Sequence, residues 1–209
     1  MKIENQTYYH LQRINNINIE WKVGDEIFFN SKRENYYWQG LKQSVSLILK
    51  NYNITEDHFN VLDAIILDET EVNRTQYQLE LILKQIHDTI DRNKIIQYCQ
   101  EVIYEHIRIQ KFNNLPSRNN CIWVVPTIND TDKWDDILPC NRKRNLKLVL
   151  TGIMHYTTGL LICTEKNRRI INAFRNAQEY WNPSINIVSE KEYLFEGSVI
   201  IDEILTINK

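Results

Sequence analysis

The chain has 209 residues and a mass of 25.1 kDa, enough for one sizeable domain or at most two small ones. Apolar residues make up 43% and charged residues 25%, close to the globular average, which excludes a chain that is disordered throughout. The formal net charge is -2, so bulk positive charge is not a basis for nucleic-acid binding, although a local basic patch is still allowed.

The sequence lacks the patterns of several common classes of protein. No apolar run reaches the roughly 20 residues of a membrane-spanning helix, and the first residues contain no apolar core of a signal peptide, so we expect a cytoplasmic protein. The four cysteines form no CxxC pair, and the five histidines form no HExxH or Cys/His cluster, so we expect no metal. Walker, GxGxxG and GxSxG motifs are also absent.

In the first half of the chain, one predicted strand precedes several predicted helices. Residues 7–13 are aromatic and β-prone, which predicts a strand. Residues 35–38 predict an aromatic loop or edge, and residues 41–51 have apolar positions at helical spacing. Thr55 is placed to cap a further helix.

The longest helical pattern covers residues 75–111, where apolar positions recur every three or four residues. The polar run Asp91-Arg92-Asn93 predicts a break into two helices. The apolar stripe is narrow and the opposite face is charged, so packing on a core and packing on a partner both remain open.

Strands return in the second half. Residues 121–125 predict a buried strand, residues 145–151 a strand, and residues 170–181 a helix. Residues 192–207 predict one or two final strands around a turn at Gly197. This order of elements favours the α+β class.

Two groups of residues are candidates for chemistry. His10 follows two tyrosines on the predicted first strand, where it is either an edge-strand residue or a hydrogen-bonding group aimed into a cleft. Glu190 and Glu192 lie two apart before an apolar strand, and that spacing places two residues on one face. One carboxylate would stabilise a cationic transition state while the other holds the incoming nucleophile, although most such pairs are solvated surface charges.

A compact basic cluster and an aromatic pair are further candidates. Arg142, Lys143 and Arg144 are either a solvated loop or a contact for phosphates. Tyr180, beside Trp181 at a helix end, is either core packing or a stacking platform for a planar ring.

Taken in order, several segments resemble the ADP-ribosyltransferase-like superfamily, and in particular uncharacterised bacterial proteins placed near it. The resembling pieces cover roughly the first 40 and the last 95 residues. They are Tyr8-Tyr9-His10, Trp21-Lys22-Val23-Gly24-Asp25, Pro116 to Trp123, Ala177 to Trp181, and Glu190 to Val199.

The resemblance implies a single domain over residues 1–209, with a split sheet around an NAD cleft and a helical insertion at about 41–112. His10, with Tyr9 beside it, matches the first-strand residue that holds the NAD ribose. Ser117 and Tyr180 are the two candidates for the middle residue near the nicotinamide, and neither matches well. Glu192 matches the late-strand glutamate that favours the oxocarbenium-like transition state, and Glu190 would then face the acceptor.

These inferences lead us to expect a mono-ADP-ribosyltransferase that moves ADP-ribose from NAD to a macromolecular acceptor and needs no metal. Arg142 to Arg144 favour nucleic acid such as RNA over protein as the acceptor. The small size resembles toxins of toxin–antitoxin or anti-phage systems, so an antitoxin protein is an expected partner. The alternatives are a non-catalytic interaction module that binds through the helices at 75–111, and an NAD glycohydrolase.

Overall fold

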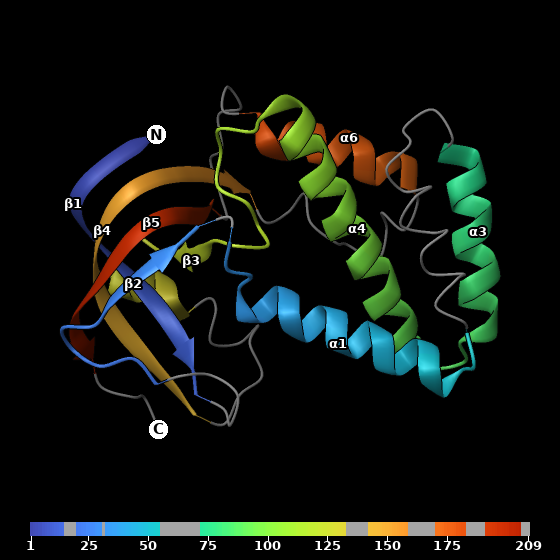
Figure 1. Ribbon diagram of the computed structural model, residues 1–209, viewed down its shortest axis with the longest axis horizontal. Coiled ribbons are helices and arrows are strands. Elements are labelled where there is room, and N and C mark those ends of the chain that lie inside the picture. Colours follow the sequence, from blue (N-terminus) through green and yellow to red (C-terminus); the bar gives the residue numbers. More distant parts are fainter. Residues whose placement is uncertain are drawn as a thin grey trace. The chain divides into compact units, whose positions relative to one another are not determined.

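Figure 1 shows a computed structural model of the chain, which describes residues 1–14, 20–30, 32–54, 72–132, 142–158, 170–182 and 191–205. Helices and an antiparallel sheet together confirm the α+β class. The chain divides into two compact units. The first consists of Met1–Tyr36, Leu115–Tyr156 and Lys191–Lys209, and the second of Tyr37–Asn114 and Thr157–Glu190. The prediction of one domain with an insertion at about 41–112 stays a prediction.

The first unit is built on a five-stranded sheet with long, strongly curved strands (Figure 1). Its hydrogen-bonded order is β1-β4-β5-β2, and β3 also pairs with β5. The strands are β1 (Lys2–Arg13), β2 (Glu26–Phe29), β3 (Ile122–Val124), β4 (Lys143–Thr158) and β5 (Lys191–Leu205). An isolated antiparallel bridge between Tyr9 and Val125 joins the end of β3 to β1, so the pairing returns to the strand where it began.

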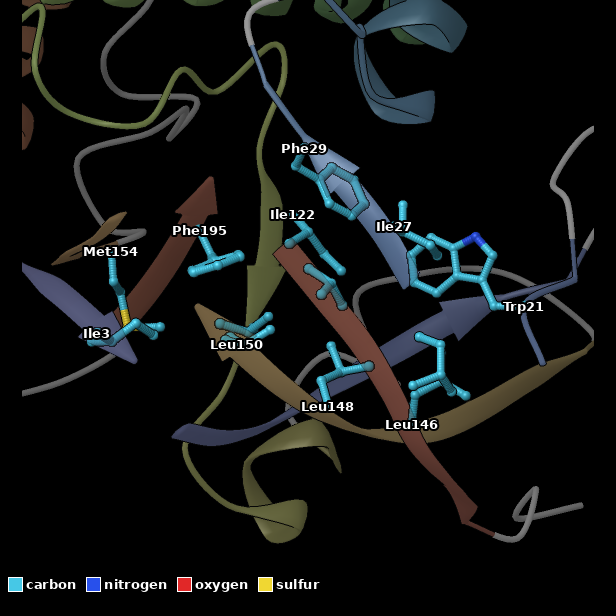
Figure 2. Close-up of a cluster of buried hydrophobic side chains, with 13 residues drawn as sticks. Ile3, Trp21, Ile27, Phe29, Ile122, Leu146, Leu148, Leu150, Met154 and Phe195 are labelled. Atoms are coloured by element: carbon cyan, nitrogen blue, oxygen red, sulfur yellow. The ribbon is translucent and has the colours of Figure 1, made fainter. Parts of the chain in front are cut away.

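The register of β1 against β4 defines an inner face of this curved sheet. Tyr8 lies opposite Leu148, His10 opposite Leu146, and Gln12 opposite Arg144. Directly opposed residues share a face, and the leucines are fully buried, so all of these positions are inner. The apolar core fills this face; Figure 2 shows Trp21 and Leu146 at one end of the cluster and Ile3 and Met154 at the other.

The second unit contains helices packed through large aromatic residues. Its helices are α1 (Tyr36–Asn51), α3 (Val72–Gln85), α4 (Thr89–Lys111) and α6 (Ile170–Trp181). The Trp181 indole Nε1 donates to the carbonyl oxygen of Tyr104 at 2.7 Å, which ties α6 to α4. None of the helices in the described ranges is long and apolar enough to cross a bilayer.

Two helix boundaries differ from the sequence predictions. The loop predicted at residues 35–38 is wrong, because residues 36–38 form the first turn of α1 and Trp38 stacks on Tyr98 at 5.2 Å. The predicted division of residues 75–111 into two helices is confirmed, but the break lies at residues 86–88 and not at 91–93. The carboxylate of Asp88 caps α4 by accepting from the backbone N–H groups of Ile90 and Asp91 at 2.8 and 3.0 Å. The helix predicted after Thr55 lies outside the described residues.

The last strand runs through Gly197 without turning, so the predicted turn is wrong. Gly197 has φ 144°, a conformation that L side chains rarely adopt, and a Cβ there would lie 2.5 Å from the Thr151 carbonyl oxygen. A Cβ at Gly152 on β4 would likewise collide with the carbonyl oxygen of Glu196. These two glycines therefore permit β4 and β5 to approach closely at one point.

Three glycine substitutions separate steric collision from backbone strain. Gly24 also has a positive φ, of 88°, but a Cβ there meets nothing within 4 Å. We expect Gly24→Ala to lose about 1 kcal/mol of unfolding free energy from backbone strain alone. Gly197→Ala should lose on the order of 2–4 kcal/mol, since strain and collision add. Gly152 has no positive φ, so the loss of unfolding free energy in Gly152→Ala should come from the steric collision alone. Denaturant unfolding measures all three; equal losses at Gly24 and Gly197 would contradict the close approach.

Candidate functional site

The candidate site lies on the inner face of β1, where the core becomes polar towards the end of the strand. Tyr8, His10 and Gln12 occupy successive inner positions, facing Leu148, Leu146 and Arg144 of β4. Tyr8 packs against the apolar core, whereas Gln12 and Arg144 are buried polar groups. His10 therefore lies at the boundary between the apolar and polar parts of this face.

Two contacts fix the His10 ring. Nδ1 donates to the carbonyl oxygen of Trp123 at 2.8 Å, because a carbonyl oxygen only accepts. The Trp21 indole stacks on the imidazole, with ring centroids 5.5 Å apart and an angle of 28° between the planes. Trp21 in turn meets Phe29 edge-on at 6.1 Å. The imidazole is thus held from β3 on one side and by the core aromatics on the other.

Burial keeps this imidazole neutral. The pKa of His10 is lowered to about 4, chiefly by desolvation; the hydrogen bond to Trp123 opposes this shift, and the Arg13 charge adds to it. With Nδ1 carrying the proton, Nε2 holds a lone pair. Within the described part of the chain, Nε2 has no hydrogen-bond partner, and the residue keeps some accessible surface. Nε2 is therefore available to accept a hydrogen bond from a hydroxyl group.

Tyrosine rings from three strands lie along the same face. The rings of Tyr8 (β1) and Tyr193 (β5) are 6.1 Å apart, and those of Tyr193 and Tyr156 (β4) are 6.2 Å apart. Burial raises the pKa of Tyr8 and of Tyr193, and the nearby Tyr8, Asp130 and Tyr156 raise that of Tyr193 further. These phenols stay protonated at neutral pH, so they offer flat aromatic surface and hydroxyl groups.

Strand β3 brings the first and last strands close together near His10. Val124 pairs with Tyr193, so the same register places Val125 opposite the backbone of Glu192. Val125 also bridges to Tyr9. Adjacent strands are about 4.8 Å apart, which puts the backbones of Tyr9 and Glu192 about 10 Å apart across β3. The side chain of Glu192 and the whole of Glu190 lie outside the described residues.

The other predicted cofactor contacts are not gathered around His10. Tyr9 alternates with His10 along β1 and so lies on the opposite face. Ser117 is buried in a turn, where its hydroxyl accepts from the Asn119 backbone N–H at 3.2 Å and its carbonyl accepts from Asn120 and Cys121. Tyr180 belongs to the second unit and is fully buried edge-on to Tyr104 at 5.1 Å, which favours core packing.

The basic cluster is divided by the strand that contains it. β4 begins at Lys143, so consecutive residues point to opposite faces. Arg142 is exposed and Lys143 half-buried, but Arg144 is 5% exposed and its guanidinium is engaged inside the fold. The solvated loop considered for these residues is therefore wrong for Arg144. A phosphate contact stays a prediction for Arg142 and Lys143.

Sequence reasoning missed two aromatic residues of this face: Trp21, which stacks on His10, and Tyr193, which lies beside Tyr8. Trp21 and Tyr193 stood in the resembling segments but were given no role, because their contacts join positions far apart in the chain. Tyrosine and histidine at alternating positions 8 and 10 of a predicted strand could have indicated a shared face. Among the described residues, no three His, Cys, Asp or Glu side chains gather as metal ligands do, and the absence of a metal stays a prediction.

The low pKa of His10 predicts a specific loss of stability in acid. The unfolded imidazole takes up a proton below about pH 6.5, whereas the folded ring resists protonation down to about pH 4. Stability is therefore lost as pH falls between these values, by about 1–3 kcal/mol from this group. Urea unfolding at pH 7, 5.5 and 4 should show a shallower acid loss for His10→Gln than for wild type. His87→Gln is the control for replacing an exposed histidine, and identical profiles for wild type and His10→Gln would contradict the burial.

Comparison with known proteins places the chain in a family. A search of curated proteins finds no match to it. A family model described as "Protein of unknown function (DUF2441)" matches residues 8–207, which include the second half of β1, with His10, and all of β5. Since the match covers nearly the whole chain, the protein belongs to the DUF2441 family.

Proposed function

We propose that this protein is a mono-ADP-ribosyltransferase, which cleaves NAD and transfers ADP-ribose to a macromolecular acceptor. One observation carries the proposal: β3 bridges to β1 beside His10 and pairs with β5 next to Glu192. The backbone segments that carry His10 and Glu192 are thus both joined to the β3 segment. The resemblance of the same segments to the ADP-ribosyltransferase-like superfamily supports the same arrangement, with the curved sheet as a split-sheet core.

His10 has the properties that ribose recognition requires. Its Nδ1 proton is committed to the Trp123 carbonyl oxygen, so Nε2 can accept only from a donor such as a ribose hydroxyl. Tyr8 lies two residues before His10 on β1, and Tyr193 lies on β5. Their rings offer flat aromatic surface. Planar rings such as nicotinamide or adenine stack on surfaces of this kind.

The proposed reaction needs a carboxylate but no metal. The bond between C1′ of the ribose and the nicotinamide nitrogen breaks, and its electron pair leaves with nicotinamide. Positive charge develops on the ribose, where the Glu192 carboxylate would stabilise it. The acceptor then bonds to C1′ and gives its proton to Glu190 acting as a base.

For the acceptor, the proposal favours nucleic acid such as RNA. Arg142 is exposed and Lys143 half-buried at the start of β4, where two cations can contact phosphates. The biological setting proposed with it, by resemblance alone, is a toxin of a toxin–antitoxin or anti-phage system, neutralised by an antitoxin protein.

Replacing Glu192 tests the catalytic assignment. Glu192→Gln keeps the shape of the side chain and removes its charge, so transfer should fall by a factor on the order of 10² or more. Glu203→Gln is the matched control, because Glu203 is an exposed glutamate further along the same strand. The measurement is the rate of nicotinamide release from NAD, with labelled ADP-ribose followed onto total RNA and protein.

The products separate the proposal from its alternatives. A glycohydrolase releases free ADP-ribose and labels nothing, whereas a transferase labels RNA or protein. NAD left intact by wild type at high enzyme concentration would eliminate both activities and leave the interaction module. Wild-type rates in Glu192→Gln would eliminate the assignment of that residue alone.

A double substitution tests the acceptor contact. Arg142→Ala with Lys143→Ala should weaken RNA binding and reduce its salt dependence by up to about two phosphate contacts. Lys22→Ala with Lys32→Ala is the control, since it removes two exposed lysines from the same unit. NAD binding should be unchanged in both. An unaltered rate of RNA modification across a range of salt would point to a protein acceptor instead.

A further inference from the structure

We infer that Arg144 is a positioning residue for His10, acting through Trp21 rather than by touching a substrate. The inference rests on the proposed function only in taking the His10 ring as the group that meets NAD. The structural part, a buried guanidinium that holds an indole against an imidazole, is independent of what binds. It assigns Arg144 a role that differs from the phosphate contact predicted for Arg142, Lys143 and Arg144 together.

The guanidinium of Arg144 connects three separate segments. Nε donates to the Gln12 side-chain oxygen at 2.8 Å, and Nη1 donates to the Glu20 carboxylate at 3.0 Å. Nη2 donates to the backbone carbonyl oxygen of Trp21. Arg144 is 5% exposed, so these bonds form where water does not compete fully. The planar fork of an arginine can reach such divergent acceptors together, whereas a lysine ammonium cannot.

These bonds determine where the Trp21 indole lies. Residues 20 and 21 precede β2 and are not part of a strand, so the sheet does not fix them. The bond from Arg144 fixes the Trp21 backbone, and the Trp21 side chain packs into the core beside Phe29 and Ile27 (Figure 2). The indole then covers one face of the His10 ring. Without the bond from Arg144, the Trp21 indole would no longer be held in a fixed stacking position on His10.

The charges around His10 make the role measurable. Arg13 lies three residues after His10 on β1, and Arg144, which bonds the Trp21 backbone, forms an ion pair with Glu20. Arg144→Lys preserves the positive charge while breaking the three-way support, so any change at His10 reports solvation and not charge. The Glu20 side chain is 55% exposed. Glu20→Gln removes its charge but leaves the bonds from Arg144 to Gln12 and Trp21 in place. The two variants therefore separate support from electrostatics.

The test is an NMR titration of the His10 imidazole, assigned by its absence in His10→Gln, together with NAD binding by calorimetry. In wild type the imidazole should titrate near pH 4, and in Arg144→Lys nearer the ordinary value of 6.5. NAD should bind Arg144→Lys on the order of tenfold more weakly. Glu20→Gln should titrate as wild type and bind NAD within about twofold. Trp21→Phe, which retains a smaller stacked ring, should lie between wild type and Arg144→Lys.

Each outcome decides one of the two proposals. A folded Arg144→Lys whose His10 titrates as in wild type overturns the positioning role. If Arg144→Lys does not fold, Trp21→Phe decides in its place, and an unshifted His10 there overturns the role equally. Absence of NAD binding by wild type overturns the proposed function, while the titrations still decide whether Arg144 and Trp21 set the state of His10.

Discussion

The paired backbone hydrogen bonds between Tyr9 and Val125, each 2.9 Å long, are the contact on which the rest of the first unit depends. They join β1 to the end of β3, which itself pairs with β5, so the pairing of the sheet returns to its first strand. Closure of this kind gives the sheet a protected inner face without help from a second layer. It also brings His10, at one end of the sequence, beside the carbonyl oxygen of Trp123, more than a hundred residues away.

The same inner face has to accommodate a charge. Desolvating a guanidinium costs several kcal/mol, and a single partner would not offset it. Arg144 instead makes three hydrogen bonds, and bonds that involve a charged group contribute about 1.5–3 kcal/mol each. The sum is of the same size as the desolvation cost, so the buried arginine adds little net stability. Its contribution is to hold the surrounding segments in position. It fixes the segment before β2, which carries Trp21 onto His10.

The sequence predicted most of the elements, because apolar periodicity can be read from one chain. The helix α6 has the predicted bounds, whereas β1 and β4 contain the predicted strands and extend beyond them. It could not predict which strands meet. The basic run 142–144 suggested one patch, but strand alternation buries its third member. Gly197 suggested a turn, but tertiary contact with Gly152 decided its conformation. The site around His10 was predictable only as a single residue, since its neighbours come from contacts of long sequence separation.

The neutral state of His10 restricts the chemistry that this face can support. With its pKa lowered to about 4 by burial, the ring is neutral at neutral pH, which makes His10 a poor general acid. A neutral acceptor is nonetheless well suited to a reaction that builds positive charge on a sugar, because an imidazolium beside that sugar would oppose the charge. Desolvation beside Trp21 therefore makes His10 unsuited to acid catalysis and leaves an uncharged imidazole that can accept a hydrogen bond. In the proposed reaction, stabilising the developing charge would then fall to a carboxylate, for which Glu192 is the proposed residue.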